Sequence, residues 1–303
     1  MLWVILAIIG ASANAAFYIV VKKYVHSLDP RLLTAIGFIL GTGILLSVSA
    51  VQGFPPIGPE YWTAVIVSAA LNVIGLTLIY AALSSSDLSL SMPMLSFTPA
   101  FLIVTSFILL GEVPSLFGIA GIMIIVSGSY VLNISSEHEN FLDPIRSMVK
   151  SRASWYMLIV AFLFAASINY DKIGMLNSDP VFGMTFTLLF IGISFAIIWA
   201  AVTISAKDQS PVHGIAMKMT LSDRFKPYIV PSIIVAFFAS VECVSINIAY
   251  TLQIVPYVIA LKRLAIIIMV LYGTIVCRES GLVARFIGAT MMVGGAVVII
   301  LFA

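Results

Sequence analysis

Charged side chains are scarce in this sequence of 303 residues, because Asp, Glu, Lys and Arg together make up only 9% of it. An ordinary soluble domain has about 25% charged residues. Apolar residues make up 61%, and segments such as 64–83 and 291–303 carry no charge, as a helix of about 20 residues needs in order to cross hydrocarbon. The composition therefore predicts an integral membrane protein. A net charge of +2 offers no basic surface for a nucleic acid.

Cysteine and histidine are also scarce. Two cysteines, Cys243 and Cys277, fall in or at the end of different hydrophobic segments, so no disulfide framework is predicted. The three histidines, His26, His138 and His213, fall in predicted loops without the spacing of metal ligands. The nucleophile, metal and paired-acid motifs of an intramembrane enzyme are missing as well. We therefore expect no metal, no cofactor and no enzymatic activity.

Hydrophobic segments separated by short polar or proline-containing turns predict an all-α fold of ten transmembrane helices. The helices are expected near residues 2–23, 31–52, 61–83, 88–110, 115–134, 154–175, 181–205, 227–252, 256–276 and 282–302. Most connections are so short that successive helices must be antiparallel neighbours. Two connections are long, at 135–152 and 206–226.

Two sets of spacings predict that the chain duplicates a five-helix unit. Lys22 and Asp29-Pro30 match Lys172 and Asp179-Pro180 at an offset of 150. Glu112, Gly121 and Gly128 match Glu279, Gly288 and Gly295 at a constant offset of 167. Because five is an odd number, the second copy must enter the membrane upside down. We therefore expect two inverted repeats, at 1–134 and 154–303, joined by a linker at 135–153.

Basic residues predict the orientation. All Lys and Arg residues except Lys172, Lys262 and Arg263 lie in or beside loops that follow odd-numbered helices. Basic residues that flank short loops stay in the cytoplasm. Both termini are therefore expected outside the cytoplasm, in a protein of the plasma membrane.

Two runs of residues at the expected offset resemble a known family. Residues 93–100 read PMLSFTPA and are followed by Leu110-Gly111-Glu112, Gly121 and Gly128. In the second half, Ala260-Leu261-Lys262-Arg263 is followed by Gly273, Glu279, Gly288 and Gly295. The two runs resemble the repeats of the drug/metabolite transporter superfamily, EamA type, over essentially the whole chain.

The resemblance implies a secondary transporter. The superfamily includes exporters of amino acids and metabolites as well as exchangers of nucleotide sugars and sugar phosphates. In its phosphate-binding branches, basic residues of the ninth helix contact the anionic substrate. The resemblance carries this role to Lys262 and Arg263.

Three charged residues are predicted inside the membrane: Glu242, Lys262 and Arg263. A charge at that depth costs about 2.5–3.5 kcal/mol, so each needs a partner, a wet cavity or a task. Glu242 should either pair with Lys262 or Arg263, or take up a proton as the carrier of an antiporter. If it pairs, one positive charge remains for an anionic substrate. A purely structural ion pair, or basic side chains that snorkel toward Pro256, are the alternatives.

Polar residues in the predicted helices complete the candidate substrate-binding set. They are Asn14, Asn72, Tyr80, Ser96, Asn247 and Tyr250. The last two belong, with Ser240, Cys243 and Thr251, to a polar stripe on the eighth helix. Such a stripe would line a water-filled path, although small polar residues such as Ser240 and Thr251 also pack helix against helix.

Two further features concern helix ends and breaks. Pro93 and Pro99 should break the fourth helix, and a broken helix inside a transporter usually borders the substrate. Glu112 and Glu279 each stand just before a helix, where a carboxylate meets the positive end of the helix dipole. For these two carboxylates we expect a structural role.

The combined expectation is a secondary active transporter that exports a small polar or amphipathic metabolite by alternating access. Its partners would be a small-molecule substrate with an anionic group, membrane lipid and, if Glu242 titrates, a coupling proton. Exchange of phosphorylated, nucleotide-linked or lipid-linked sugars is one alternative, and a non-transporting scaffold or sensor is another. The glycines Gly37, Gly41 and Gly43 fit either packing inside a monomer or a homodimer contact.

Overall fold

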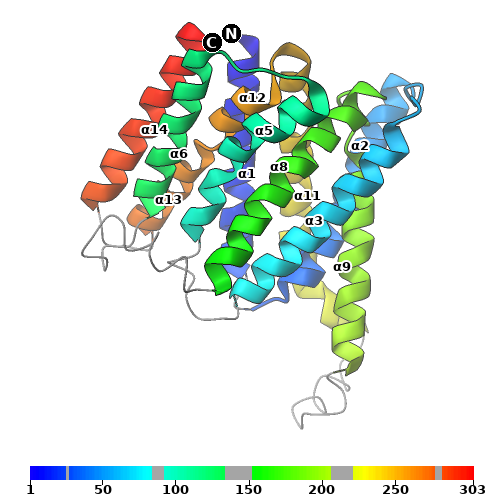
Figure 1. The fold of residues 1–303 in the computed structure, drawn as a ribbon. Coiled ribbons are helices and arrows are strands. Elements are labelled where there is room, and N and C mark those ends of the chain that lie inside the picture. The colour runs from blue at the N-terminus through cyan, green and yellow to red at the C-terminus, as the bar shows by residue number, and fades with distance from the viewer. Residues whose placement is uncertain (25–26, 84–91, 134–151, 206–220, 277–281) are drawn as a thin grey trace.

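The computed structural model describes residues 1–24, 27–83, 92–133, 152–205, 221–276 and 282–303, and in these residues all regular structure is helical (Figure 1). The three histidines and Glu279 lie outside the described residues. The all-α prediction is confirmed. Both termini lie at the same end of the bundle in Figure 1, as an even number of membrane crossings requires.

The helices fall in the ten predicted segments. The first half contains α1 (Leu2–Tyr24), α2 (Pro30–Gln52), α3 (Tyr61–Leu83), the 3₁₀ helix η1 (Met92–Phe97), α5 (Thr98–Leu110) and α6 (Leu116–Asn133). The second half contains α8 (Arg152–Leu176), α9 (Thr185–Ser205), α11 (Leu221–Leu252), α12 (Val255–Lys262), α13 (Ala265–Val276) and α14 (Leu282–Phe302). The pairs η1/α5 and α12/α13 each occupy one predicted segment.

Length and hydropathy place this bundle in a membrane. Among the described residues, six helices are long and apolar enough to cross a bilayer, and three shorter apolar helices accompany them. Large apolar side chains point outward from the bundle, for example Ile108 with 70% exposure and Ile197 with 64%. Water would penalise such a surface, whereas lipid tails do not. The chain is a multi-pass membrane protein.

Two predicted boundaries move. α9 begins at Thr185 rather than near 181, because the Asp179 carboxylate holds the preceding residues in a turn. Its Oδ1 accepts hydrogen bonds from the backbone N–H groups of Val181 and Phe182, both at 2.7 Å. α11 begins at Leu221, six residues earlier than the predicted 227, and continues through Pro227 and Pro231.

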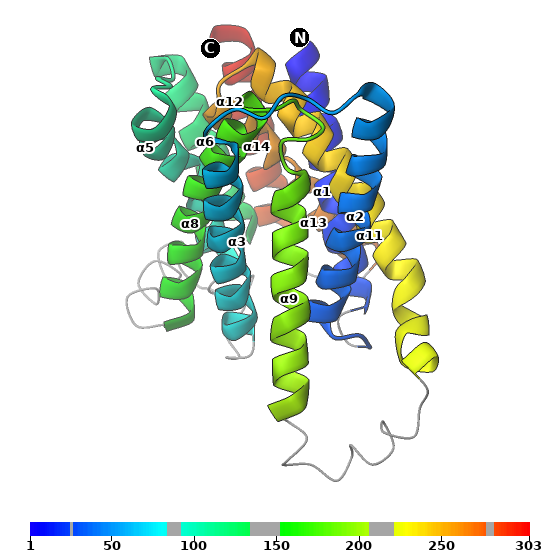
Figure 2. The ribbon, with the colours of Figure 1, turned by 90° about the vertical axis from the view of Figure 1, so that its right-hand side faces the viewer.

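Helix contacts follow the pattern of an inverted duplication (Figures 1 and 2). α1 packs along α11, and α3 packs along α8, which is the same contact with the two halves exchanged. α2 packs along α9 and α6 along α14, each with its own counterpart. Exchanging the halves therefore leaves the main contacts unchanged, as a pseudo-two-fold axis would.

Glycines show the same symmetry at atomic scale where α6 meets α14. A Cβ atom at Gly121 would lie 2.8 Å from the carbonyl oxygen of Gly295, and one at Gly128 would lie 2.7 Å from that of Gly288. In the duplication, Gly121 corresponds to Gly288 and Gly128 to Gly295. The equivalent glycines therefore pack crosswise, as they must when two copies run antiparallel.

Both the fourth and the ninth membrane segments are broken. The fourth changes from η1 to α5 at Thr98, next to Pro99, as its prolines predict. The break between α12 and α13 has no proline and was not predicted. There the backbone tightens to 3₁₀-type hydrogen bonds, such as Leu264 N–H to Leu261 O at 2.9 Å and Ile266 N–H to Arg263 O at 3.0 Å. The offset of 167 places the η1/α5 break, at residues 97–98, on residues 264–265.

α12 lies at the centre of the largest apolar cluster. Every residue from Val255 to Leu261 is buried, and the helix contacts α1, α5, α6, α8, α11 and α14. The next residue, Lys262, carries the first charge of this segment. The fold therefore places Lys262 and Arg263 at the end of a central helix whose other residues are all buried.

Candidate functional site

Three predicted site residues from three helices meet near the break in the ninth segment. Glu242 of α11 forms an ion pair with Lys262 at the end of α12. Asn14 of α1 donates hydrogen bonds from Nδ2 to both carboxylate oxygens of Glu242, each at 3.0 Å. The Lys262 and Glu242 side chains are 23% and 17% exposed. This cluster of Asn14, Glu242 and Lys262, the central cluster, joins the first half to the second.

Arg263 follows directly and leaves part of its guanidinium unused. Among the described residues its Nε is buried and has no hydrogen-bond partner. A buried donor without an acceptor costs about 1–3 kcal/mol, more when it is charged. Of these two consecutive cations, Lys262 pairs with Glu242, whereas the ion pairs among the described residues include none of Arg263. A bound anion could therefore compensate the charge of Arg263.

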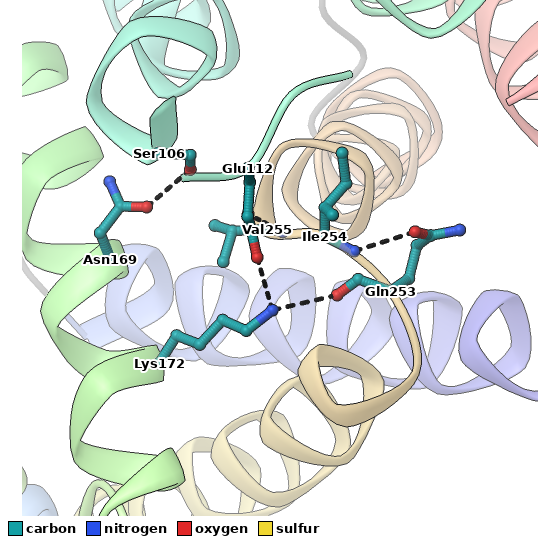
Figure 3. A network of polar contacts seen from close by, with 7 residues as sticks. All are labelled: Ser106, Glu112, Asn169, Lys172, Gln253, Ile254 and Val255. Carbon is teal, nitrogen blue, oxygen red and sulfur yellow. Dashed lines mark hydrogen bonds and ion pairs between the residues drawn. The ribbon is translucent and has the colours of Figure 1, made fainter. Parts of the chain in front are cut away.

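The second conspicuous network lies between the two halves at the start of α12 (Figure 3). Lys172 of α8 forms an ion pair with Glu112 at 2.6 Å and donates to the carbonyl of Gln253 at 3.4 Å. The other carboxylate oxygen of Glu112 accepts from the backbone N–H of Val255 at 2.8 Å. The two charged side chains are only 10% and 11% exposed.

The position of Glu112 corrects part of its predicted role. The carboxylate was expected to stabilise the start of the helix that follows it, α6. It instead accepts from the first turn of α12 in the other half of the chain. The prediction that Glu112 lies at a helix N-terminus was right. The helix is α12, however, and not α6, the next helix along the chain. Lys172 is its cation, a partner that sequence reasoning missed.

Asn72 lies in a third network, on α3 and α8. Its Nδ2 donates to Ser167 Oγ at 2.6 Å and to the Ser68 carbonyl at 3.0 Å. Ser68 donates to the carboxylate of Asp171. Asp171 is a buried acid that sequence reasoning overlooked because it stands close to the end of its helix. The signal was available, since Ser68 and Asn72, like Ser167 and Asp171, are four residues apart and share a helix face.

Apart from Thr251, the polar stripe of α11 is packed against protein in this conformation. Asn247 is buried and donates to the Pro180 carbonyl at 2.9 Å. Tyr250 is 4% exposed, and the Lys172 ammonium lies 6.0 Å from its ring centre. Ser240 lies 3.4 Å from the Gly41 carbonyl, within hydrogen-bond reach.

The remaining candidates are placed as follows. Thr251, expected to pack between helices, is exposed and bonds to the Ile248 carbonyl of its own helix. Ser96 is buried and shares a 2.7 Å hydrogen bond with Ser129 of α6. The side chain of Tyr80 lies outside the described residues. Neither Thr251 nor Ser96 joins the central cluster in this conformation.

Comparisons with known proteins support the fold and the family. A protein of known crystal structure, 15% identical in sequence, superposes with a TM-score of 0.71 over 98% of this chain and 98% of its own. No curated protein sequence matches this chain. Residues 1–134 match the model of the EamA-like transporter family.

Proposed function

We propose that this membrane transporter exports a small polar or amphipathic metabolite that carries a carboxylate or another anionic group. The observation that carries the proposal is the central cluster together with Arg263. Glu242 balances Lys262, while the buried Nε of Arg263 has no partner among the described residues. Ionisable groups inside membrane proteins usually serve transport or binding. An anionic group of the substrate would supply the missing acceptor.

Alternating access accounts for the placement of this cluster. Its residues come from both halves, and the halves contact each other through symmetry-related helix pairs. Transporters of inverted repeats commonly place broken helices beside the substrate. In our proposal the two halves rock about the central cluster. Asn72, Tyr80, Ser96, Asn247 and Tyr250 then reach the substrate path in a more open conformation.

We further propose that the repeats extend over 1–134 and 154–303, and that both termini face away from the cytoplasm of a plasma-membrane protein. Figure 1 supports the placement of both termini on the same side of the membrane, because both lie at one end of the bundle. The proposal that this side faces away from the cytoplasm rests on the positions of the basic residues.

A ligand-binding measurement tests the proposed site. Purified protein would be heated with the common amino acids, with other metabolic carboxylates and with uncharged analogues. A bound ligand raises the unfolding temperature by mass action. We expect selected anionic ligands to stabilise the wild type and to lose this effect in Lys262→Gln and Arg263→Gln. Lys23→Gln, at an exposed lysine, is the matched control. Equal stabilisation of all four proteins would contradict the proposed site.

A second candidate is exchange of phosphorylated sugars. Adjacent Lys262 and Arg263 favour it, because a phosphate accepts hydrogen bonds from both kinds of side chain. Counterflow in liposomes separates the candidates: unlabelled sugar phosphate inside would drive uptake of labelled sugar phosphate for an exchanger. A metabolite exporter would instead ignore sugar phosphates and respond to its own substrate.

A further inference from the structure

A buried acid, Asp171, stands apart from the central cluster. It lies on α8, five residues before the end of the helix at Leu176, which is about 7.5 Å along the helix axis. The residue is 8% exposed. Its Oδ1 accepts a hydrogen bond from Ser68 Oγ of α3, and Ser68 is fully buried. The carboxyl group is therefore inside the bundle and touches a helix of the other half.

Hydrogen-bond donors lead toward this carboxyl group in one direction. Asn72 Nδ2 donates to Ser167 Oγ at 2.6 Å, and the Ser167 and Ser68 hydroxyls are 3.0 Å apart. Asn72 Nδ2 also donates to the Ser68 carbonyl, which can only accept, so the orientation of its amide is determined. The Ser68 hydroxyl donates a hydrogen bond to Asp171. The chain of donors thus ends at the acid.

No cationic side chain lies within ion-pair distance of Asp171 in the part of the chain that the structure describes. The helices packed against α8 include α3, η1 and α5, and these three contain no Asp, Glu, Lys, Arg or His. Lys262 of α12 acts on Asp171 electrostatically, and Asp171 in turn acts on Tyr250 and Cys243 of α11. Lys262 already pairs with Glu242, and the neighbouring Lys172 pairs with Glu112.

An ionised carboxylate in this place would be costly. Burying a charge is strongly unfavourable unless a counter-charge and hydrogen bonds compensate it. Asp171 has one hydroxyl donor, whereas Glu242 has a lysine and an amide bound to both oxygens. Asp171 and Glu242 are therefore held in unequal environments, and the environment of Asp171 favours the protonated carboxyl group.

We propose that Asp171, with Ser68, Ser167 and Asn72, forms a proton-binding site that couples transport to proton movement. The carboxylate takes a proton from water on one side of the membrane, becomes a neutral carboxylic acid and returns the proton to water on the other. A metal ion fits less well, because Ca²⁺ takes six to eight oxygen ligands and Asn72 presents an N–H group here. The coupling role rests on the proposed transport function; proton binding itself does not.

Infrared spectroscopy of the purified protein tests proton binding without a substrate. A protonated carboxylic acid has a carbonyl band that disappears on ionisation. We expect this band in wild-type protein and in Glu242→Gln, its loss in Asp171→Asn, and its return in Asp171→Glu if the longer side chain is tolerated. Asp171→Asn changes almost no volume, and a monodisperse, helical protein would exclude misfolding as the cause. An unchanged band in Asp171→Asn would overturn the proposal.

Proton movement in liposomes tests the coupling. A pH-sensitive dye inside the liposomes would report protons when the common amino acids or sugar phosphates are added outside. Wild-type protein should move protons with a transported compound, and Asp171→Asn should keep counterflow of that compound but lose the proton signal. A proton signal in Asp171→Asn would refute the coupling. Absence of any counterflow by the wild type would instead refute the proposed transport function, and the infrared band would still decide the proton site.

Discussion

At the scale of single residues, the central cluster shows how a membrane protein retains a charge. The Glu242 carboxylate accepts hydrogen bonds from Asn14 on both oxygens and forms an ion pair with Lys262 through one of them. Removing one partner of such a pair is usually more harmful than removing both, because the remaining charge loses its compensation. The pair is therefore mutually dependent, and its energetics can be tested without knowing the substrate.

Glu242→Gln should lower the free energy of unfolding by about 1–3 kcal/mol, less than a fully sealed pair because both side chains are partly exposed. The double variant Glu242→Gln with Lys262→Met should recover most of that loss. Chemical denaturation in detergent gives both values. A single variant as stable as the wild type would show that the ion pair contributes nothing.

Sequence reasoning found some site residues and not others for physical reasons. Glu242 and Lys262 stand well inside hydrophobic segments, so their cost in lipid is evident from the sequence and their pairing follows. Asp171 and Lys172 stand near the end of α8, where a charge looks like an interfacial residue. Only the fold shows that other helices cover that end and bring Ser68 and Glu112 to them.

At the scale of helices, positions and breaks differ in how far the sequence predicts them. Hydropathy located all ten segments, and the prolines predicted the break between η1 and α5. The break between α12 and α13 carries no such mark, because 3₁₀ turns can form from ordinary residues when tertiary contacts require them. The repeat offset of 167 would have located it, if the first break had been carried over to the second half.

The close contact between α6 and α14 predicts that alanine substitutions at two adjacent glycines differ in their effect on stability. Gly295→Ala places a Cβ 2.7 Å from the Gly121 carbonyl oxygen, so the helices must separate. We expect a loss of about 1–3 kcal/mol in the free energy of unfolding. Gly294→Ala is the control, since nothing lies within 4 Å of its Cβ position. Similar stability of the two variants would refute the close packing.

The ion pair between Lys172 and Glu112 fastens α8 to the start of α12 (Figure 3). Glu112→Gln keeps an oxygen for the Val255 N–H but leaves the Lys172 ammonium buried without its counter-charge. The expected loss is about 3–5 kcal/mol in the free energy of unfolding. The exposed Glu60→Gln should change stability little. Equal thermal stability of both variants would contradict a structural role for this pair.

At the scale of the whole molecule, the two halves share a helix arrangement but differ in the side chains at equivalent positions. The halves share helix pairing and glycine contacts, yet Lys262 and Arg263 occupy places where the first half has Leu95 and Ser96, by the offset of 167. A symmetric frame suits alternating access, since either side can open by the same motion. We propose that the unequal side chains determine which substrate this symmetric fold prefers.

Orientation is a prediction about the whole molecule. The basic loops predict that both termini face away from the cytoplasm. A reporter active only in the cytoplasm, fused after Ala303, should therefore be silent, while one inserted in the predicted connection at 206–226 should be active. A cytoplasmic signal from the C-terminal fusion would reverse the assignment and, with it, the sides between which the substrate moves.

The central claim is that the cations at the end of α12 bind the anionic group of a transported solute. Counterflow of the ligand that best stabilises the wild type, measured in liposomes, tests it most directly. Wild-type protein and Lys23→Gln should exchange labelled ligand, whereas folded Arg263→Gln should lose exchange. Undiminished exchange by both single variants, Arg263→Gln and Lys262→Gln, would contradict the claim.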